Sequence, residues 1–65
     1  MTREEFKWIR VQRHHSQESL AEVLDYSRRQ IVRWENGESA IPDRVAYVMR
    51  YEVPNWFKLV RKESR

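Results

Sequence analysis

Apolar residues recur along the first part of the chain every three or four positions, the spacing of one helix face. A T-x-x-E sequence from Thr2 to Glu5 predicts a capping box that opens the first helix. Phe6 and Ile9 form its apolar face, and Arg10 lies beside them. No segment alternates apolar and polar residues over the length of a strand, so the pattern predicts an all-α chain.

Two short helices are predicted in the middle of the chain. Ser16 is a favourable N-cap for the first of them, whose apolar positions are Leu20, Ala21 and Leu24. A second capping sequence, S-x-x-Q, begins at Ser27 and opens a helix that Asn36 and Gly37 end. The gap between Leu24 and Ser27 leaves room only for a tight turn between the two helices.

Two more helices are predicted in the last third of the chain. Pro42 and Asp43 begin the fourth, whose apolar positions are Val45, Val48 and Met49. Pro54 or Asn55 begins a fifth helix that runs through Val60. With no linker and no repeat, the sequence predicts one domain over residues 1–65, a compact all-α fold of five short helices.

The helix predicted after Ser27 has two different faces. At about 100° per residue, an arc of roughly 140° holds Arg28, Arg29, Val32, Arg33 and Asn36, while Ile31 and Trp34 point to the other side. The major groove of DNA admits one α-helix, and an arginine there can read a guanine or bind a phosphate. The pattern favours DNA binding, and a solvated basic face is the alternative.

Composition narrows the function further. The net charge is +3, and ten of the 13 basic residues are arginine, whose planar guanidinium pairs with phosphates and guanines. Sixty-five residues leave no room for a separate catalytic domain, and without cysteine there is neither a disulfide nor a cysteine-based zinc site. Neither a signal peptide nor a membrane span is recognisable, so we expect a cytoplasmic protein.

His14 and His15 do not indicate a metal site, because adjacent helical residues point about 100° apart and nothing completes a ligand set. Ser16 beside His15 is better explained as a helix cap than as a nucleophile. We therefore expect no enzymatic activity, no metal or other cofactor and no small-molecule ligand. The aromatic residues are expected to fill the core and a dimer contact rather than to stack on single-stranded bases.

The segment from Ser16 to Gly37, SQESLAEVLDYSRRQIVRWENG, resembles the helix-turn-helix of the Cro and phage-repressor (XRE-like) family. The family pattern is SQ-x-x-LA, a turn, S-x-x-x-I-x-x-W-E-N-G and a later proline, here Pro42. The resemblance extends more weakly over residues 6–49 and implies a lambda-repressor-like domain. Asp25 replaces the usual turn glycine but tolerates left-handed geometry. His15 replaces an apolar residue, and we expect it to be half-buried.

The resemblance also implies a role for individual side chains. Base reading falls to Arg28, Arg29, Val32 and Arg33. Contacts with the DNA backbone fall to Gln17, Ser27, Asn36, Ser39 and Arg44. Arg10 and Glu35 form a structural ion pair that holds the carboxylate away from the phosphates. Gln30 either caps its own helix or meets the DNA, and capping is the favoured interpretation.

These roles predict a sequence-specific regulator of transcription that binds double-stranded DNA. We expect a homodimer on an inverted repeat, because a single helix reads only a few base pairs. The candidate dimer contacts are Trp56, Phe57 and Val60, and Trp8 could join them, pack on the fifth helix or lie beside the DNA backbone. Repression by promoter occlusion is the simplest mechanism, in a phage or mobile-element operon by analogy. The alternative is a protein-binding helix-turn-helix module, such as an antitoxin or accessory regulator.

Overall fold

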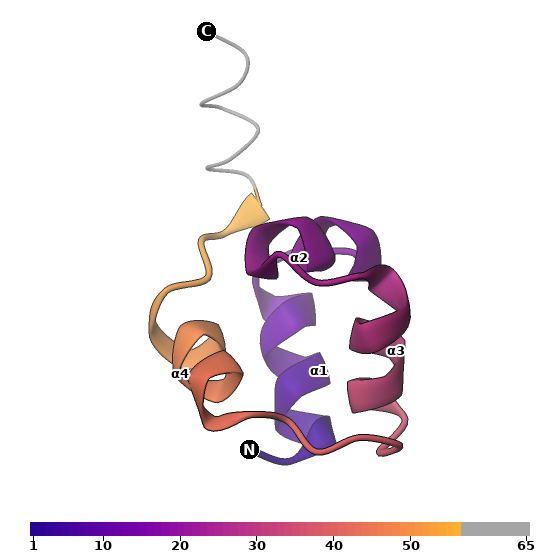
Figure 1. The fold of residues 1–65 in the computed structure, drawn as a ribbon. Helices are drawn as coiled ribbons and strands as arrows, with labels where there is room; N and C mark the ends of the chain where they lie inside the picture. Colours follow the sequence, from indigo (N-terminus) through magenta and orange to yellow (C-terminus); the bar gives the residue numbers. More distant parts are fainter. Residues whose placement is uncertain (57–65) are drawn as a thin grey trace, which may run out of the picture.

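The computed structural model describes residues 1–56, and these form four α-helices and no strand. The helices are α1 (Arg3–Gln12), α2 (Gln17–Leu24), α3 (Arg28–Glu35) and α4 (Asp43–Tyr51). Figure 1 shows α1 between α3 and α4, with α2 across one end of the bundle. The all-α prediction is confirmed for this part of the chain. Most of the predicted fifth helix falls in residues 57–65, outside the described residues.

Side-chain caps begin the first three helices, as the sequence predicts. The capping hydroxyls each accept a hydrogen bond from the backbone N–H three residues later and belong to Thr2, Ser16 and Ser27. Such a cap is worth about 1 kcal/mol. A capping box also contains a second bond, from the N–H of the capping residue to the side chain three positions later. Neither Glu5 nor Gln30 makes this bond within residues 1–56, so that part of the prediction was wrong. The Glu5 carboxylate binds Arg50 instead, a stronger charged donor. The backbone N–H of Gln30 donates to the capping hydroxyl of Ser27, and within residues 1–56 the Gln30 side chain makes no capping bond.

A left-handed residue makes the turn between α2 and α3. Asp25 has φ 61° and ψ 44°, which confirms the expectation that aspartate adopts the left-handed conformation in place of the usual glycine. The next N–H, of Tyr26, donates to the carbonyl of Ala21 at 2.9 Å and closes the end of α2. The Tyr26 ring packs edge-on against Trp34 of α3, with centroids 4.9 Å apart. The turn is therefore fixed both by its backbone and by the core beneath it.

The core lies where the inner faces of the four helices meet. Its fully buried side chains are Phe6, Leu20, Ile31, Met49 and Val53. Trp34 is also buried, and its ring meets that of Phe6 edge-on at 5.8 Å. Leu24 and Val48, predicted as core positions, pack at the margin of the core and are half-buried. Burial of each large apolar side chain stabilises the fold by about 1.5–3 kcal/mol.

The chain after α4 is bound to the end of α1. The guanidinium of Arg13 donates to the carbonyl of Val53. The N–H of Trp56 donates to the carbonyl of Arg13 at 2.9 Å. These bonds seat the buried Val53 side chain over the core. Residues 53–55 are accordingly not helical.

His15 is fully buried, at 3% exposure, and not half-buried as expected. Its Nδ1 lies 2.9 Å from the Ser19 hydroxyl, and its Nε2 lies 2.8 Å from the carbonyl oxygen of Pro54. Pro54 belongs to the segment after α4, which covers the ring. The imidazole therefore links the start of α2 to that segment, and the ring's polar atoms are satisfied inside the protein.

Glu5 and Arg50 join the outer sides of α1 and α4. Two hydrogen bonds of 3.1 and 3.0 Å connect the guanidinium to the two carboxylate oxygens. The bond from Arg50 lowers the pKa of Glu5 below its ordinary value of 4.5. A lowered folded-state pKa means that the stabilisation is present above the unfolded-state pKa and is lost as the pH falls through the folded-state pKa.

A Glu5→Gln variant should therefore be less stable than the wild type at pH 7, and this difference should shrink as the pH falls below 4.5. Urea unfolding of both proteins between pH 7 and pH 2 measures the difference directly. Glu22→Gln is the matched control, because Glu22 is an exposed carboxylate elsewhere on the surface. A difference between wild type and variant that does not change with pH would contradict the assignment.

Candidate nucleic-acid interface

The α3 helix is buried on one side and exposed on the other. Ile31 and Trp34 lie in the core, with 0% and 2% exposure. The outer side contains the exposed residues Arg28, Arg29 and Arg33, with half-buried Val32 between them. Figure 1 shows that α3 forms one flank of the bundle, so no other helix of residues 1–56 covers this outer side. The structure thus brings the four predicted base-reading residues onto one accessible face.

The first turns of α2 and α3 lie close together beside this face. The Nε of Arg28 is 4.0 Å from a carboxylate oxygen of Glu18, and both side chains are exposed. Ser27, predicted to approach the DNA backbone, is exposed at the start of α3. The two helices that the sequence joins into one motif therefore also present their N-terminal ends together.

Glu35 is the centre of a partly buried polar network. Arg10 donates to its two oxygens, from Nε at 2.6 Å and from Nη2 at 3.3 Å. The expected ion pair is thus present, and the side chains of Arg10 and Glu35 are only 13% and 6% exposed. The remaining guanidinium nitrogen of Arg10 donates to the His15 carbonyl at 2.9 Å. This network joins α1 to α3 and to the chain that leads into α2.

Gln17 is also bound to this network. Its Nε2 donates to Glu35 at 3.2 Å, so its amide is oriented before any ligand arrives. Gln17 is predicted to contact the DNA backbone, and its internal bond to Glu35 was not predicted. No local signal could reveal it, because the two residues are far apart in the chain and meet only through tertiary packing.

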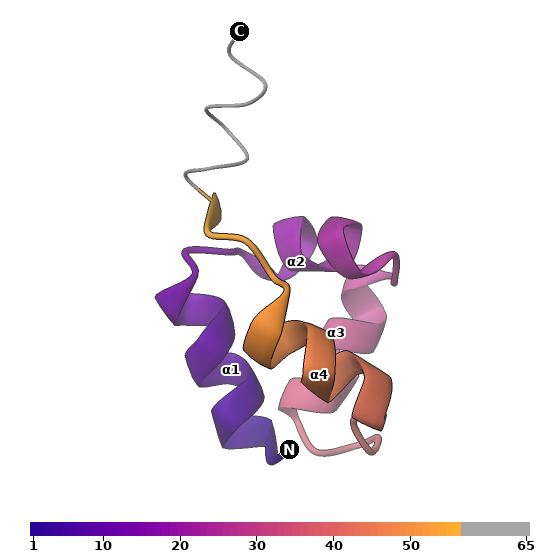
Figure 2. The same cartoon turned by 90° about the vertical axis from the view of Figure 1, so that its left-hand side faces the viewer.

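The C-terminal end of α3 is surrounded by charged groups. The side-chain amide of Asn36 donates to Glu38 at 3.2 Å, and the backbone carbonyl of Asn36 accepts from Arg3 at 3.0 Å. Gly37 has φ 76°, and a Cβ at this position would lie 2.9 Å from the Arg3 guanidinium. The positive φ is what favours glycine here, since the exposed Arg3 side chain could move away from a Cβ. Figures 1 and 2 show the N-terminus beside the loop between α3 and α4.

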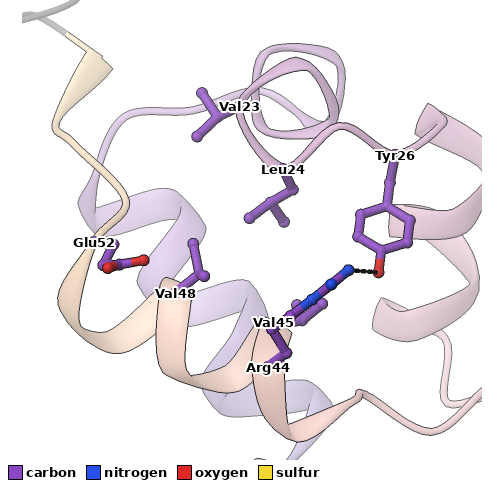
Figure 3. Close-up of a pocket in the computed structure, with 7 residues that line it drawn as sticks. All are labelled: Val23, Leu24, Tyr26, Arg44, Val45, Val48 and Glu52. Atoms are coloured by element: carbon purple, nitrogen blue, oxygen red, sulfur yellow. Dashed lines mark hydrogen bonds between the residues drawn. The ribbon is translucent and has the colours of Figure 1, made fainter.

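Arg44 and Ser39, the other two predicted backbone contacts, lie beyond α3. Ser39 is half-buried in the loop, and Arg44 is exposed in the first turn of α4. Arg44 donates to the Tyr26 hydroxyl at 3.3 Å and so stands next to the α2–α3 turn (Figure 3). Arg44 and Tyr26 line a cleft of about 290 Å³ with an aliphatic floor and Glu52 on its far side.

The candidate dimer contacts are only partly described. Trp56 is partly exposed, at 37%, whereas Phe57 and Val60 lie outside the described residues. Trp8 is 63% exposed on α1 and borders a shallow apolar hollow with Val11. Trp8 therefore lies exposed on the surface of α1.

Two exposed tyrosines on α4 were overlooked in the sequence. Tyr47 and Tyr51 are one helical turn apart, and their ring centroids are 5.1 Å apart. Their i, i+4 spacing on the side of α4 away from Val45 and Met49 is a signal that could have identified them. Trp8 and Val11 are likewise exposed apolar side chains, on α1.

Residues 1–56 contain neither a candidate membrane span nor a candidate metal site. None of the helices there is both long and apolar enough to cross a membrane. That part of the chain also contains no cluster of three or more histidine, cysteine or acidic side chains that could bind a metal ion.

Two helices joined by a tight turn, the second presenting an exposed arginine-rich face, define a helix-turn-helix DNA-binding domain. The family model described as Helix-turn-helix matches residues 6–49, more than half of the chain. The chain therefore belongs to the helix-turn-helix family of the Cro and XRE type, whose members are DNA-binding regulators of transcription. No curated protein and no solved structure matches the chain.

Proposed function

We propose that the protein is a sequence-specific repressor that binds an inverted repeat in double-stranded DNA as a homodimer. The observation that supports this proposal is the outer side of α3. Three exposed arginines lie there on a helix that Ile31 and Trp34 fix to the core. A rigid helix with an accessible basic face fits the major groove, where arginine discriminates guanine from the other bases.

In this proposal the residues divide into two groups. Arg28 and Arg29 lead the base reading, Val32 contacts a thymine methyl group, and Arg33 reads a base or anchors the helix. The contacts with the DNA backbone come from Gln17, Ser27, Asn36, Ser39 and Arg44. These contacts supply affinity and register but no sequence information, so selectivity rests on the first group.

A dimer supplies the affinity that one helix lacks. The proposed contact contains Trp56 together with Phe57 and Val60. A two-fold dimer places its recognition helices about 34 Å apart, one turn of DNA. A dimer bound over a promoter excludes polymerase by its presence alone, so repression by occlusion requires no further activity. An autoregulated phage or mobile-element operon is the setting that the family resemblance suggests.

Selection of bound duplexes from a random pool tests this function. We expect enrichment of an inverted repeat with half-sites centred about 10 base pairs apart. Binding to the selected duplex should weaken steeply with salt, by about 10³-fold or more between 50 and 200 mM if six or more phosphates are contacted. A pool that yields no enriched duplex, or binding that salt does not affect, would contradict the proposal.

The second candidate function is docking to another protein, as an antitoxin or accessory regulator does. The observation that favours it is the exposed apolar hollow that Trp8 and Val11 border on α1, since exposed apolar surface commonly marks protein interfaces. Substitution separates the two candidates. Trp8→Ala should weaken binding to a protein partner and leave DNA binding intact, whereas Arg28→Ala should do the reverse.

A further inference from the structure

Three side chains that the proposed function assigns to DNA are paired with carboxylates of the protein itself. Gln17 donates to Glu35 at 3.2 Å, and Asn36 donates to Glu38 at 3.2 Å. The third is Arg28, whose Nε lies 4.0 Å from Glu18. In the free protein, each of these three side chains therefore has a carboxylate oxygen within 4.0 Å.

Glu35 is built into the fold, whereas the other two carboxylates lie at the surface. Glu35 is partly buried and bound bidentately by Arg10. Glu18 and Glu38 are exposed, and so are the residues that they pair with in the described part of the chain, Arg28 and Asn36. Glu18 lies in the first turn of α2, where a negative charge stabilises the helix. The exposed pairs with Arg28 and Asn36 themselves contribute little to stability, so folding does not account for the pairing.

We propose that Glu18 and Glu38 suppress binding to DNA of arbitrary sequence by competing with phosphates for Arg28 and Asn36. This inference rests on the proposed function and adds to it a source of selectivity. A phosphate must displace the carboxylate, which then remains near the DNA and repels it. Binding to arbitrary sequence is almost entirely electrostatic and therefore feels the whole penalty.

The two carboxylates differ in their effect on the operator. Arg28 is a base reader, and a guanine offers it two hydrogen bonds that no arbitrary sequence supplies in register. These bonds compensate for the loss of Glu18 only at the correct site, so Glu18 raises selectivity. Asn36 meets a phosphate in either complex, so Glu38 weakens both complexes to a similar degree. Glu18 alone therefore provides selectivity by an added repulsive element, whereas Glu38 lowers affinity without changing selectivity.

Glu18→Gln and Glu38→Gln test the proposal, with Glu52→Gln as the control of equal charge change at the exposed end of α4. The full-length proteins are titrated with a selected operator, a duplex of random sequence and heparin at several salt concentrations. Each of the first two variants should bind the random duplex and heparin about two- to fivefold more tightly than wild type, as for one like charge removed near a phosphate in water.

The ratio of operator affinity to random-duplex affinity should fall about twofold or more in Glu18→Gln and stay constant in Glu38→Gln. The proposal is overturned if both variants match Glu52→Gln, or if the Glu18→Gln ratio does not fall. Binding to heparin distinguishes a failure of this proposal from a failure of the proposed function. Tighter heparin binding by the variants, with no preference of the wild type for any duplex, would uphold the competition for anions and reject the proposed function.

Discussion

An Arg10→Ala variant is expected to lose about 3 kcal/mol of its free energy of unfolding. The side chain of Glu35 is only 6% exposed, so removing the guanidinium leaves a charge that water cannot readily solvate. Breaking a buried ion pair from one side costs about 3–5 kcal/mol. The carbonyl of His15 loses its donor as well. A domain of this size is stable by roughly 3–10 kcal/mol, so the variant should be only marginally folded.

Thermal and urea unfolding measure this effect, and the melting temperature should fall by roughly 10 °C or more. Arg50→Ala is the matched control, because it removes an arginine from the exposed pair with Glu5 and should cost much less. The double variant Arg10→Met with Glu35→Gln should recover part of the loss, since it leaves no unpaired charge. A wild-type melting temperature in Arg10→Ala would show that the pair is not structural.

Features that depend on neighbouring residues were predictable from the sequence. The N-caps of α1, α2 and α3 each involve a hydroxyl and an N–H three residues apart, so the local sequence contains both partners. The left-handed turn at Asp25 is also local. The two faces of α3 follow from helical periodicity alone, and burial of Ile31 and Trp34 agrees with it. The Arg10–Glu35 pair was reached only through the family resemblance.

Features that depend on distant residues were not predictable. Glu5 leaves its capping partner for Arg50, which lies 45 positions later and reaches it only because α1 packs on α4. His15 is covered by Pro54, 39 positions away, so nothing near the histidine indicates full burial. The carboxylate partners of Gln17 and Arg28 likewise depend on the packing of α2 against α3. Local patterns thus determined the helices and the exposed face, but not the polar partners of its residues.

Alanine at Arg28 or Arg29 should weaken binding to the selected operator by about 5- to 150-fold, the equivalent of 1–3 kcal/mol for one lost bidentate contact. Both side chains are exposed in the first turn of α3, so truncation should leave the fold intact. Arg50→Ala again serves as the control, because it removes one positive charge from α4. Equal losses in all three variants would mean that only net charge matters.

Lysine at the same positions distinguishes base reading from phosphate binding. Lysine keeps the charge but lacks the planar fork that bonds both O6 and N7 of guanine. A base-reading arginine should therefore lose most of its contribution on replacement by lysine, and the preference for one base pair should relax. A phosphate-binding arginine should tolerate lysine, and its alanine variant should make the salt dependence less steep by about one phosphate contact. If lysine is fully tolerated at both Arg28 and Arg29, these residues anchor the helix, and the reading of sequence must pass to Val32 and Arg33.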